Sequence, residues 1–161
     1  YEVENDCPLS LDCYKSFDKG LELSKKYNKP ILLDFTGWAC ANCRRVEENT
    51  WSDPSVYDLI NNKFILISLY VDDRTNLGDG VITLRDKNGN KKILETVGEK
   101  WSAFQTLNFK INSQPYYVLI SPDLKILNSP IQYTDTESYE RWLNEGLESF
   151  TSRNKLPQKE L

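Results

Sequence analysis

Three short apolar runs stand out along the chain and predict buried strands. They occupy residues 31–35, which one acid interrupts, 64–71 and 116–120. The run over 64–71 is nearly continuous, which is typical of a strand covered on both faces. Between and around them, helical spacing of apolar residues and helix start signals predict helices. These helices are expected over residues 17–28, from Cys40 onward, over 55–61, over 98–109 and over 136–150. Asp53-Pro54 is the start signal of the third one, with an N-cap residue followed by proline at the first helical position. Helices that alternate with strands favour an α/β layered structure.

Two β-hairpins are also predicted. In the first, residues 81–84 and 92–94 flank an Asn-Gly pair, which is a strong turn signal. In the second, a turn over 121–123 leads from the last apolar strand into residues 125–127. A closing hairpin makes the sheet mixed rather than fully parallel, so we expect a central mixed sheet flanked by helices, with an inserted hairpin around 81–95.

The length of 161 residues suits one domain with short appendages. We expect an irregular N-terminal extension over 1–15, the domain over 16–150 and a flexible polar tail over 151–161. No apolar run approaches the roughly 18–20 residues of a membrane span. Because the chain begins with tyrosine and contains no methionine, we expect a processed protein or a piece of a longer one.

Composition removes several classes of function. The chain has no histidine, which excludes Ser-His and Cys-His catalytic pairs and His-ligated metals. The net charge is −4 without a strongly basic stretch, so nucleic acid and anionic membranes are poor candidates as partners. The chemistry left to consider depends on cysteine, carboxylate, lysine, tyrosine or serine side chains.

The four cysteines include a Cys-x-x-Cys motif, Cys40-Ala41-Asn42-Cys43, which follows a predicted strand and opens a predicted helix. A helix N-terminus offers unpaired N–H groups and a positive dipole end, and both stabilise a thiolate. In an α/β pattern this placement favours a redox dithiol. Half of a zinc site and an inert structural disulfide are weaker interpretations, because Cys7 and Cys13 lack zinc-ligand spacing and so small a loop gains little from closure.

These residues carry a resemblance to a known family. The strand with its internal acid, the Cys-x-x-Cys motif and Gln114-Pro115 before a strand resemble thioredoxin-fold proteins. The segment KPILLDFTGWACANCRRVEENTWSDPSV is similar to the C-terminal periplasmic domain of the thiol:disulfide interchange protein DsbD, in the form seen in Bacteroidetes-like sequences. The resemblance covers roughly residues 14–150 and implies a thioredoxin fold.

The resemblance also implies roles for single residues. Cys40 would be the nucleophile and Cys43 the resolving thiol. Asp34 and Glu47 match the acids that the family places near the dithiol, where two buried carboxylates would raise the pKa of the thiols and relay protons. The alternatives are a surface acid at the edge of a strand for Asp34 and a solvated helix face for Glu47.

Three further positions follow from the same resemblance. Pro115 would be the family's cis-proline beside the dithiol, and Gln114 would present its backbone to an extended partner chain. Thioredoxins place a tryptophan directly before the first cysteine, whereas here Ala39 holds that position and Trp38 lies one residue earlier. Trp38 is still expected to contribute to partner binding.

The dipeptide between the cysteines predicts the redox direction. Ala41-Asn42 contains no cation that would stabilise a Cys40 thiolate, so we expect a reducing dithiol rather than a disulfide donor. For Cys7 and Cys13 we predict a structural disulfide, since an extracytoplasmic location would permit one. A second redox relay is the alternative, and mass mapping of alkylated, non-reduced protein separates the two.

The resemblance implies a protein-disulfide reductase domain that uses no cofactor or metal. It would be a periplasmic, soluble domain of an inner-membrane protein, reduced by a membrane domain. It would pass electrons to the N-terminal domain of the same protein, and from there to disulfide isomerases and cytochrome c maturation proteins. A freestanding secreted reductase and a non-enzymatic interaction module are the alternatives. The insertion over 72–95 would either contact a partner or pad the sheet edge, and padding is favoured because loop insertions cost little stability.

Overall fold

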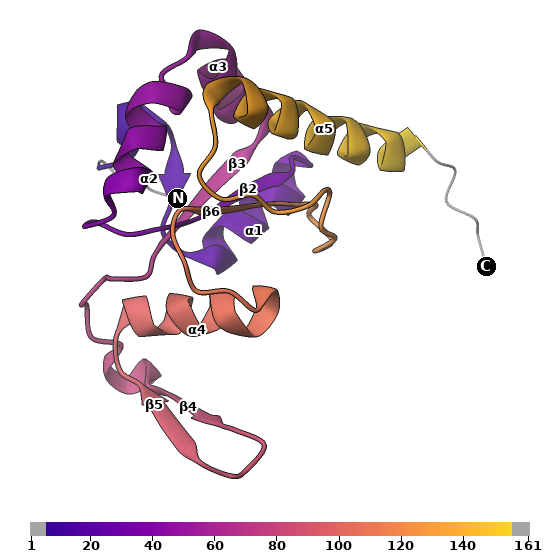
Figure 1. Ribbon diagram of the computed structural model, residues 1–161. Helices are drawn as coiled ribbons and strands as arrows, with labels where there is room; N and C mark the ends of the chain where they lie inside the picture. Colours follow the sequence, from indigo (N-terminus) through magenta and orange to yellow (C-terminus); the bar gives the residue numbers. More distant parts are fainter. Residues whose placement is uncertain (1–5, 156–161) are drawn as a thin grey trace, which may run out of the picture.

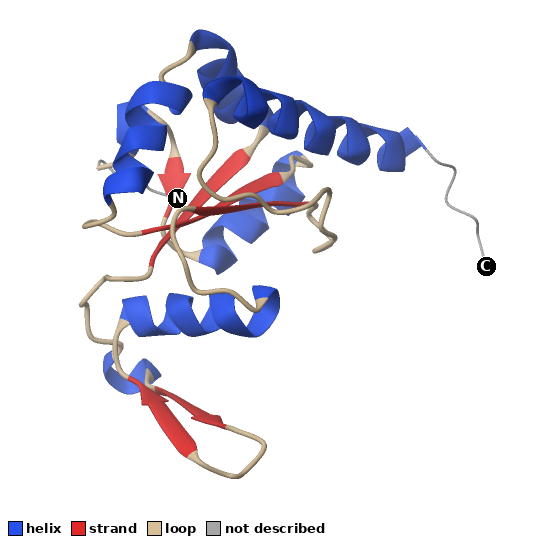
Figure 2. Cartoon of the chain, in the orientation of Figure 1, coloured by secondary structure: helices blue, strands red, loops and turns tan. Residues whose placement is uncertain are grey.

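The computed structural model describes residues 6–155, in which a four-stranded sheet lies between two layers of helices (Figures 1 and 2). In order across the sheet, the strands are β1 (Cys13–Tyr14), β3 (Ile65–Tyr70), β2 (Ile31–Thr36) and β6 (Tyr116–Ile120). The α-helices are α1 (Phe17–Tyr27), α2 (Ala41–Val46), α3 (Pro54–Lys63), α4 (Val97–Phe109) and α5 (Thr136–Lys155). The remaining elements are the 3₁₀ turns η1 (Pro8–Ser10) and η3 (Gly78–Gly80), the π-helical turn η2 (Glu47–Trp51) and a separate hairpin of β4 (Ile82–Arg85) and β5 (Lys91–Leu94).

The sheet is mixed, as predicted, and helices cover both of its faces. The central strand β2 runs parallel to β3 and antiparallel to β6. Its Leu33 is therefore flanked by Ile67 on one side and Val118 on the other. The antiparallel member is β6 itself, because the inserted hairpin does not join the central sheet.

Side chains of β2 alternate between two hydrophobic cores. Ile31, Leu33 and Phe35 pack on the side covered by α1 and α4, whereas Leu32 packs on the side covered by α2, α3 and α5. Since successive side chains of a strand point to opposite faces, Asp34 lies on the same side as Leu32. This alternation directs a carboxylate into the layer that contains the Cys-x-x-Cys helix.

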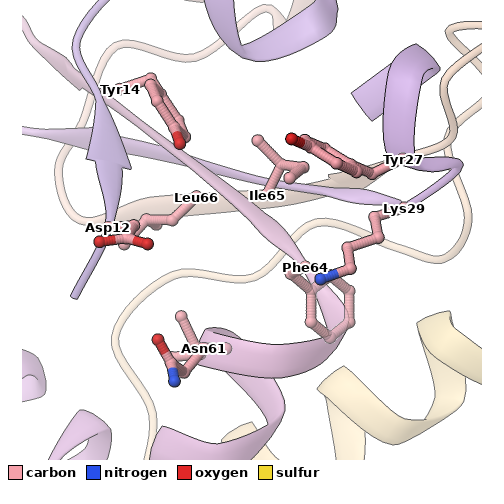
Figure 3. Close-up of a pocket in the computed structure, with 9 residues that line it drawn as sticks. Asp12, Tyr14, Tyr27, Lys29, Asn61, Phe64, Ile65 and Leu66 are labelled. Carbon is pink, nitrogen blue, oxygen red and sulfur yellow. The ribbon is translucent and has the colours of Figure 1, made fainter. Parts of the chain in front are cut away.

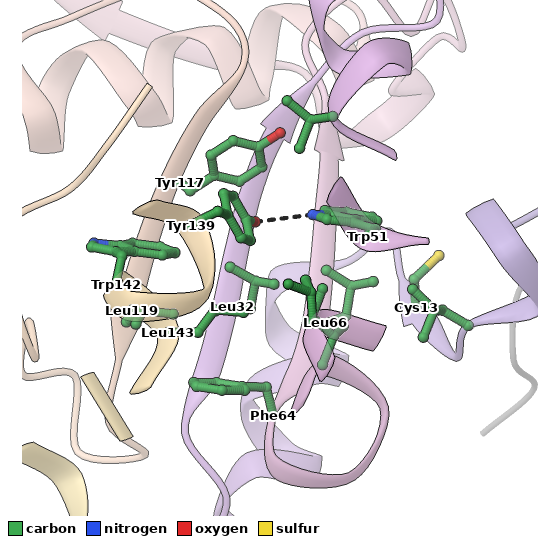
Figure 4. Packing of buried hydrophobic residues seen from close by; sticks show 14 of the residues in the cluster. Cys13, Leu32, Trp51, Phe64, Leu66, Tyr117, Leu119, Tyr139, Trp142 and Leu143 are labelled. Carbon is green, nitrogen blue, oxygen red and sulfur yellow. Dashed lines mark hydrogen bonds between the residues drawn. The ribbon is translucent and has the colours of Figure 1, made fainter. Parts of the chain in front are cut away.

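The core on that side is rich in aromatic rings and contains a buried hydrogen bond (Figure 4). The indole Nε1 of Trp51, in η2, donates to the hydroxyl of Tyr139, in α5, at 3.0 Å. Both rings also lie against Tyr117 of β6. A buried indole N–H and a buried phenol thus satisfy each other, and the bond holds the end of the α2–η2 segment against α5.

The helix start at Asp53-Pro54 is confirmed. The Asp53 carboxylate accepts hydrogen bonds from the backbone N–H groups of Ser55 at 3.0 Å and Val56 at 3.4 Å, and Pro54 is the first residue of α3. Proline suits that position because its missing N–H has no partner there in any helix.

The second predicted hairpin is confirmed only as a turn with an antiparallel return, because residues 125–127 form no strand. They meet β6 only through an isolated bridge between Ile120 and Ile126, and the chain touches the strand again at Ile131. The return segment is short, and Pro130 interrupts it with a residue that has no N–H to donate. The segment covers the outer edge of β6 without extending the sheet.

The two ends of the chain are more regular than predicted. Cys13–Tyr14, within the expected irregular extension, forms the short strand β1 and pairs with Leu66 and Ile67 of β3. Helix α5 continues to Lys155, beyond the predicted end at 150, and the remainder of the predicted tail, like residues 1–5, lies outside the described residues. The division into extension, domain and tail stays a prediction. Across residues 6–155, no helix combines the length and the apolar character needed to cross a bilayer.

The insertion between β3 and α4 is anchored where it leaves and rejoins the domain. The backbone N–H groups of Val97 and Gly98 donate to the carbonyl groups of Thr75 and Asp73 at 2.9 and 2.8 Å. Beyond this root, the β4–β5 hairpin lies on the far side of α4 from the central sheet (Figure 1). The first predicted hairpin is thus confirmed, with Gly89 in its turn at a φ of +82°.

Replacing Gly98 with alanine is expected to destabilise the protein by about 2–3 kcal/mol. A Cβ at this position would lie 2.6 Å from the backbone oxygen of Val71 and 2.8 Å from backbone atoms of Asp73, so α4 or the root of the insertion must shift. The measurement is urea unfolding of the oxidised protein. Gly80→Ala is the control, since nothing lies within 4 Å of its Cβ. Equal unfolding free energies for the two variants would contradict the close approach.

Candidate active site

The Cys-x-x-Cys pair lies where β2 gives way to α2. Cys40 is the N-cap residue of α2, and its sulfur accepts a hydrogen bond from the backbone N–H of Cys43 at 3.2 Å. The two residues form a disulfide. Cys40 is half-buried, whereas Cys43 is 1% exposed. An incoming group can therefore reach Cys40 and is shielded from Cys43, which is the asymmetry expected of a nucleophile and a resolving thiol.

Both predicted acids are buried in the layer beside this helix. Asp34 is 2% exposed on the central strand, and its carboxyl accepts a hydrogen bond from the hydroxyl of Ser68 at 3.0 Å. Burial, together with the nearby charge of Glu47, raises the pKa of Asp34 to about 8. Burial likewise raises the pKa of Glu47, which is 7% exposed, to about 7. Neither residue is the solvated surface acid of the alternative interpretations.

Arg44 connects the acids to the turn before the dithiol. Its guanidinium lies 3.0 Å from the carboxylate of Glu47 and donates to the hydroxyl of Thr36 at 3.1 Å and to the carbonyl of Gly37 at 3.2 Å. Its charge lowers the pKa of Glu47 against the larger effect of burial. Arg45, by contrast, is exposed. No role for Arg44 could be predicted from the sequence alone.

We expect the Arg44→Gln substitution to raise the pKa of Glu47 above its value of about 7, because a favourable charge interaction is lost while burial remains. The measurement is a carbon-13 NMR titration of the side-chain carboxyl groups in the oxidised protein. Arg45→Gln is the control, and Glu47 should titrate there as in the parent protein. An unchanged midpoint in Arg44→Gln would contradict the ion pair.

A carboxylate that the sequence analysis missed fixes the turn before Cys40. Asp72, at the start of the insertion, accepts hydrogen bonds from the backbone N–H groups of Trp38 at 2.9 Å and Ala39 at 3.0 Å. The available signal was an acid placed just after a buried strand, at the same sheet edge as the end of β2. The root of the insertion is thus bonded to the active-site turn.

The side chain of Trp38, in this turn, packs against another aromatic ring and a lysine. Its ring stacks on Tyr70 with 4.0 Å between centroids, and the ammonium group of Lys15 lies 4.8 Å from the Trp38 centroid. Lys15 also pairs with Asp6. Trp38 remains 45% exposed, so a large apolar surface is open to a partner close to Cys40 in the chain.

Gln114 and Pro115 are joined by a cis peptide bond and precede β6. Because Phe35 of β2 pairs with Tyr116, this bond lies at the same end of the sheet as the active-site turn. Pro115 is buried, and the side-chain amide of Gln114 donates to the side-chain oxygen of Gln105 at 2.8 Å. The Gln114 side chain is therefore held internally.

The second cysteine pair lies apart, at the β1 edge of the sheet. Cys7 and Cys13 form a disulfide, in which Cys13 is fully buried and Cys7 partly buried. The four cysteines thus occur as two separate bonds. Within residues 6–155, no group of three or more cysteine, aspartate, glutamate or histidine side chains is placed to hold a metal ion.

A pocket of about 270 Å³ opens at the opposite end of the sheet from the dithiol (Figure 3). Its lining includes Asp12, Tyr14, Tyr27 and Lys29, together with residues at the start of β3. Because β2 and β3 are parallel and Cys40 follows the end of β2, this pocket is remote from the sulfur chemistry.

A mixed α/β sheet with a Cys-x-x-Cys disulfide at a helix N-terminus and a cis-proline before the antiparallel strand defines a thioredoxin-fold dithiol protein. The profile of the thioredoxin-like family matches residues 12–120, and the chain belongs to that family.

Among curated proteins, the chain is 31% identical over 80 residues to the thiol:disulfide interchange protein DsbD of Campylobacter jejuni strain RM1221. That match covers 50% of this chain and only 14% of the length of the relative.

Comparison with solved structures confirms the predicted thioredoxin fold. A thioredoxin from Thermus thermophilus superposes with a TM-score of 0.65 at 14% identity, covering 94% of this chain and 98% of the other. The reduced C-terminal domain of Neisseria meningitidis DsbD superposes with a TM-score of 0.56 at 13% identity, covering 80% of this chain and 92% of that domain. The more specific similarity to Bacteroidetes-like sequences stays a prediction.

Proposed function

We propose that this chain is a protein-disulfide reductase that uses Cys40 and Cys43 as its redox dithiol. The observation that carries the proposal is the unequal placement of the two sulfurs at the start of α2. Cys40 is reachable and its sulfur accepts the Cys43 backbone N–H, an arrangement that favours a thiolate on Cys40 in the reduced protein. Cys43 is enclosed, so it reacts within the molecule.

The reaction proceeds in two exchanges. The Cys40 thiolate attacks one sulfur of a partner disulfide, forms a mixed disulfide and releases the other partner sulfur as a thiolate, which takes up a proton. The Cys43 thiolate then attacks the Cys40 sulfur and releases the second partner thiol. Two electrons pass to the partner, and the Cys40–Cys43 disulfide remains.

Asp34 and Glu47 serve as proton carriers in this scheme. The second exchange requires Cys43 to lose a proton within a buried layer, where water is scarce. A carboxyl with a pKa of about 7, as in Glu47, can accept and return a proton near neutral pH. Asp34 lies on the central strand β2, and the charge of Glu47 in η2 helps to raise its pKa. The two acids therefore titrate as a coupled pair.

The direction of electron flow is from this chain to its partner. Arg44, the nearest cation after the motif, is occupied by Glu47, Thr36 and Gly37, and Ala41-Asn42 contributes no charge. The Cys40 thiolate therefore lacks the strong cationic stabilisation that makes a dithiol an oxidant.

We further propose that the chain acts as a C-terminal domain in a DsbD-like protein. It would face the periplasm, receive electrons from a membrane domain and pass them to an N-terminal domain and its partners. The sequence match to Campylobacter jejuni DsbD supports this placement. A gene that encodes several membrane spans before this segment would agree with it, whereas a secretion signal alone would favour a freestanding reductase.

Trapping of the mixed disulfide tests the reductase proposal. The Cys43→Ser variant, reduced and mixed with purified insulin, should accumulate a covalent adduct through Cys40, because no second thiol resolves it. The adduct should appear on a non-reducing gel, disappear with dithiothreitol and map to Cys40 by mass spectrometry. If no adduct forms while the variant remains folded, the chain is a non-enzymatic interaction module.

A further inference from the structure

The distal end of the β4–β5 hairpin is a positively charged surface on an acidic chain. One acid, Asp86, lies there among four cations. The cations are Arg85, Lys87, Lys91 and Lys92. The hairpin end therefore carries a net charge of +3, although the whole chain carries −4. The rest of the chain then carries −7, so positive charge is concentrated on the insertion.

These cations are open to solvent. All four are exposed, and among the described residues none of them forms an ion pair within 4 Å. The carboxylate of Asp86 is engaged by its own turn, where it accepts hydrogen bonds from the backbone N–H groups of Asn88 and Asn90 at 2.8 and 2.9 Å. The side-chain amide of Asn90 donates to it as well, at 3.0 Å. The turn thus uses the one nearby acid and leaves the cations free.

The strand register places two of the cations directly opposite each other. Arg85 pairs with Lys91 across the hairpin, and the next pair on the same face is Thr83 with Ile93. Like charges in directly opposed positions destabilise a sheet. Ile93 is 53% exposed on this face. The repulsion between Arg85 and Lys91 and the exposure of Ile93 to water both destabilise the hairpin on its own. An anionic, partly apolar partner would reduce both costs.

The root of the hairpin is fixed to the active-site turn. Asp72 binds the backbone of Trp38 and Ala39, and the backbone N–H of Leu77 donates to the carbonyl of Glu95 at 2.8 Å, closing the base of the insertion. The root of the insertion therefore lies at the same end of the sheet as Cys40, and the hairpin extends from it beyond α4 (Figure 1). A partner that spans the two can touch both the hairpin and Cys40.

We propose that the end of the hairpin, formed by Arg85, Lys91 and Ile93 on one face and by Lys87 in the turn, docks an acidic segment of the partner protein whose disulfide Cys40 reduces. The proposal rests on the reductase function and adds a class of substrate to it. Ammonium and guanidinium groups recognise carboxylates, and Ile93 offers an apolar contact beside them. The link to the active-site turn favours a protein substrate over a lipid surface. A charged surface on the insertion, remote from the reacting sulfur but joined to its turn through the root, can thus select substrates by charge.

A peptide-binding measurement tests the docking face without requiring catalysis. The probe is a fluorescein-labelled, cysteine-free peptide with four glutamates and one leucine, and its counterpart carries glutamine in place of glutamate. Fluorescence anisotropy with the oxidised protein at 50 and 300 mM NaCl should show binding of the glutamate peptide that weakens with salt. The triple variant Arg85→Gln, Lys87→Gln, Lys91→Gln should bind it about 10-fold more weakly.

A matched variant controls for net charge. Lys19→Gln, Lys25→Gln, Lys26→Gln removes the same number of charges from exposed positions on α1 and should bind the glutamate peptide as the parent protein does. Equal loss of affinity in both triple variants, or equal affinity for the two peptides, would overturn the proposal. So would binding only to vesicles of 30% phosphatidylserine in phosphatidylcholine. Urea unfolding of both variants verifies that they fold.

A kinetic measurement connects docking to reduction. The substrates are a cyclic disulfide peptide joined to four glutamates by Gly-Ser linkers of graded length, and neutral bis(2-hydroxyethyl) disulfide. The hairpin variant should lose about 10-fold in kcat/KM on the acidic peptide and nothing on the neutral disulfide. If the parent protein reduces neither, the reductase function fails while the peptide-binding result still decides the docking face. If the parent protein and the triple hairpin variant reduce the acidic peptide with equal kcat/KM, docking on the hairpin does not assist reduction and the proposal is overturned.

Discussion

Replacing Cys40 with serine is expected to lower the rate of protein-disulfide reduction at least about 1000-fold. Cys40 supplies the sulfur of the pair that an incoming disulfide can reach, because Cys43 is 1% exposed beneath it. A serine hydroxyl at the same N-cap position preserves the helix start but is not ionised near neutral pH. The measurement is insulin reduction with dithiothreitol as the electron source, corrected for the uncatalysed rate.

The second cysteine pair provides the matched control. Cys7→Ala together with Cys13→Ala removes a disulfide at the far edge of the sheet and should leave the reduction rate within about twofold of the parent. Closure of so short a loop contributes about 2 kcal/mol in the chain-entropy description, so the double variant should unfold at lower urea concentration. A large loss of activity in this folded variant would instead indicate a second redox relay. Activity retained by Cys40→Ser would refute the nucleophile.

Replacing Asp34 with asparagine is expected to stabilise the oxidised protein at pH 8 by about 3–5 kcal/mol and to have little effect at pH 4. The carboxyl has a pKa of about 8 in the folded chain and 3.8 as its ordinary value, so between these limits the folded protein holds a proton that the unfolded chain has released. The unfolding free energy of the parent therefore falls as pH rises from about 4 to 8. Asparagine does not titrate, so it removes this decline, and its side-chain oxygen can still accept the Ser68 hydroxyl hydrogen.

Urea unfolding at pH intervals between 4 and 8 measures the effect. Asp79→Asn, at an exposed position in η3, is the control and should change the unfolding free energy by no more than about 0.5 kcal/mol at each pH. Parallel pH profiles for the parent and Asp34→Asn would show that Asp34 is already ionised in the folded chain. The same variant should slow disulfide reduction, since a proton carrier is lost.

The sequence was informative where a residue's environment follows from its immediate neighbours. Asp34 lies in a run of Ile, Leu and Phe, so its burial could be expected from the run alone. The Cys-x-x-Cys pair lies between a strand and a helix start, and both boundaries were visible. Asp53-Pro54 combines two start signals and marked the beginning of α3 correctly.

Contacts between distant segments could not be predicted in this way. Asp72 binds a turn 33 and 34 residues away along the chain, and that meeting depends on the parallel pairing of β2 with β3. Arg44 and Arg45 are chemically identical, and only the direction of the helix decides which one turns toward Glu47. The return at 125–127 has the apolar pattern of a strand, but its length and Pro130 allow just an isolated bridge. For Asp72 and Arg44, packing rather than local preference decides the outcome.

The segment over 125–131, which runs along β6 without forming a strand, has a consequence for self-association. An uncovered outer strand presents a row of free N–H and C=O groups, which is a template for recruiting another chain. Here the Tyr117 N–H and carbonyl are both bonded to Ile131, at 2.8 and 3.1 Å, and Leu127 donates to the carbonyl of Leu119 at 2.9 Å. The strand next to the cis-proline is thereby closed to a neighbouring copy, and fibril-like growth of the sheet from that side is blocked by the chain's own backbone.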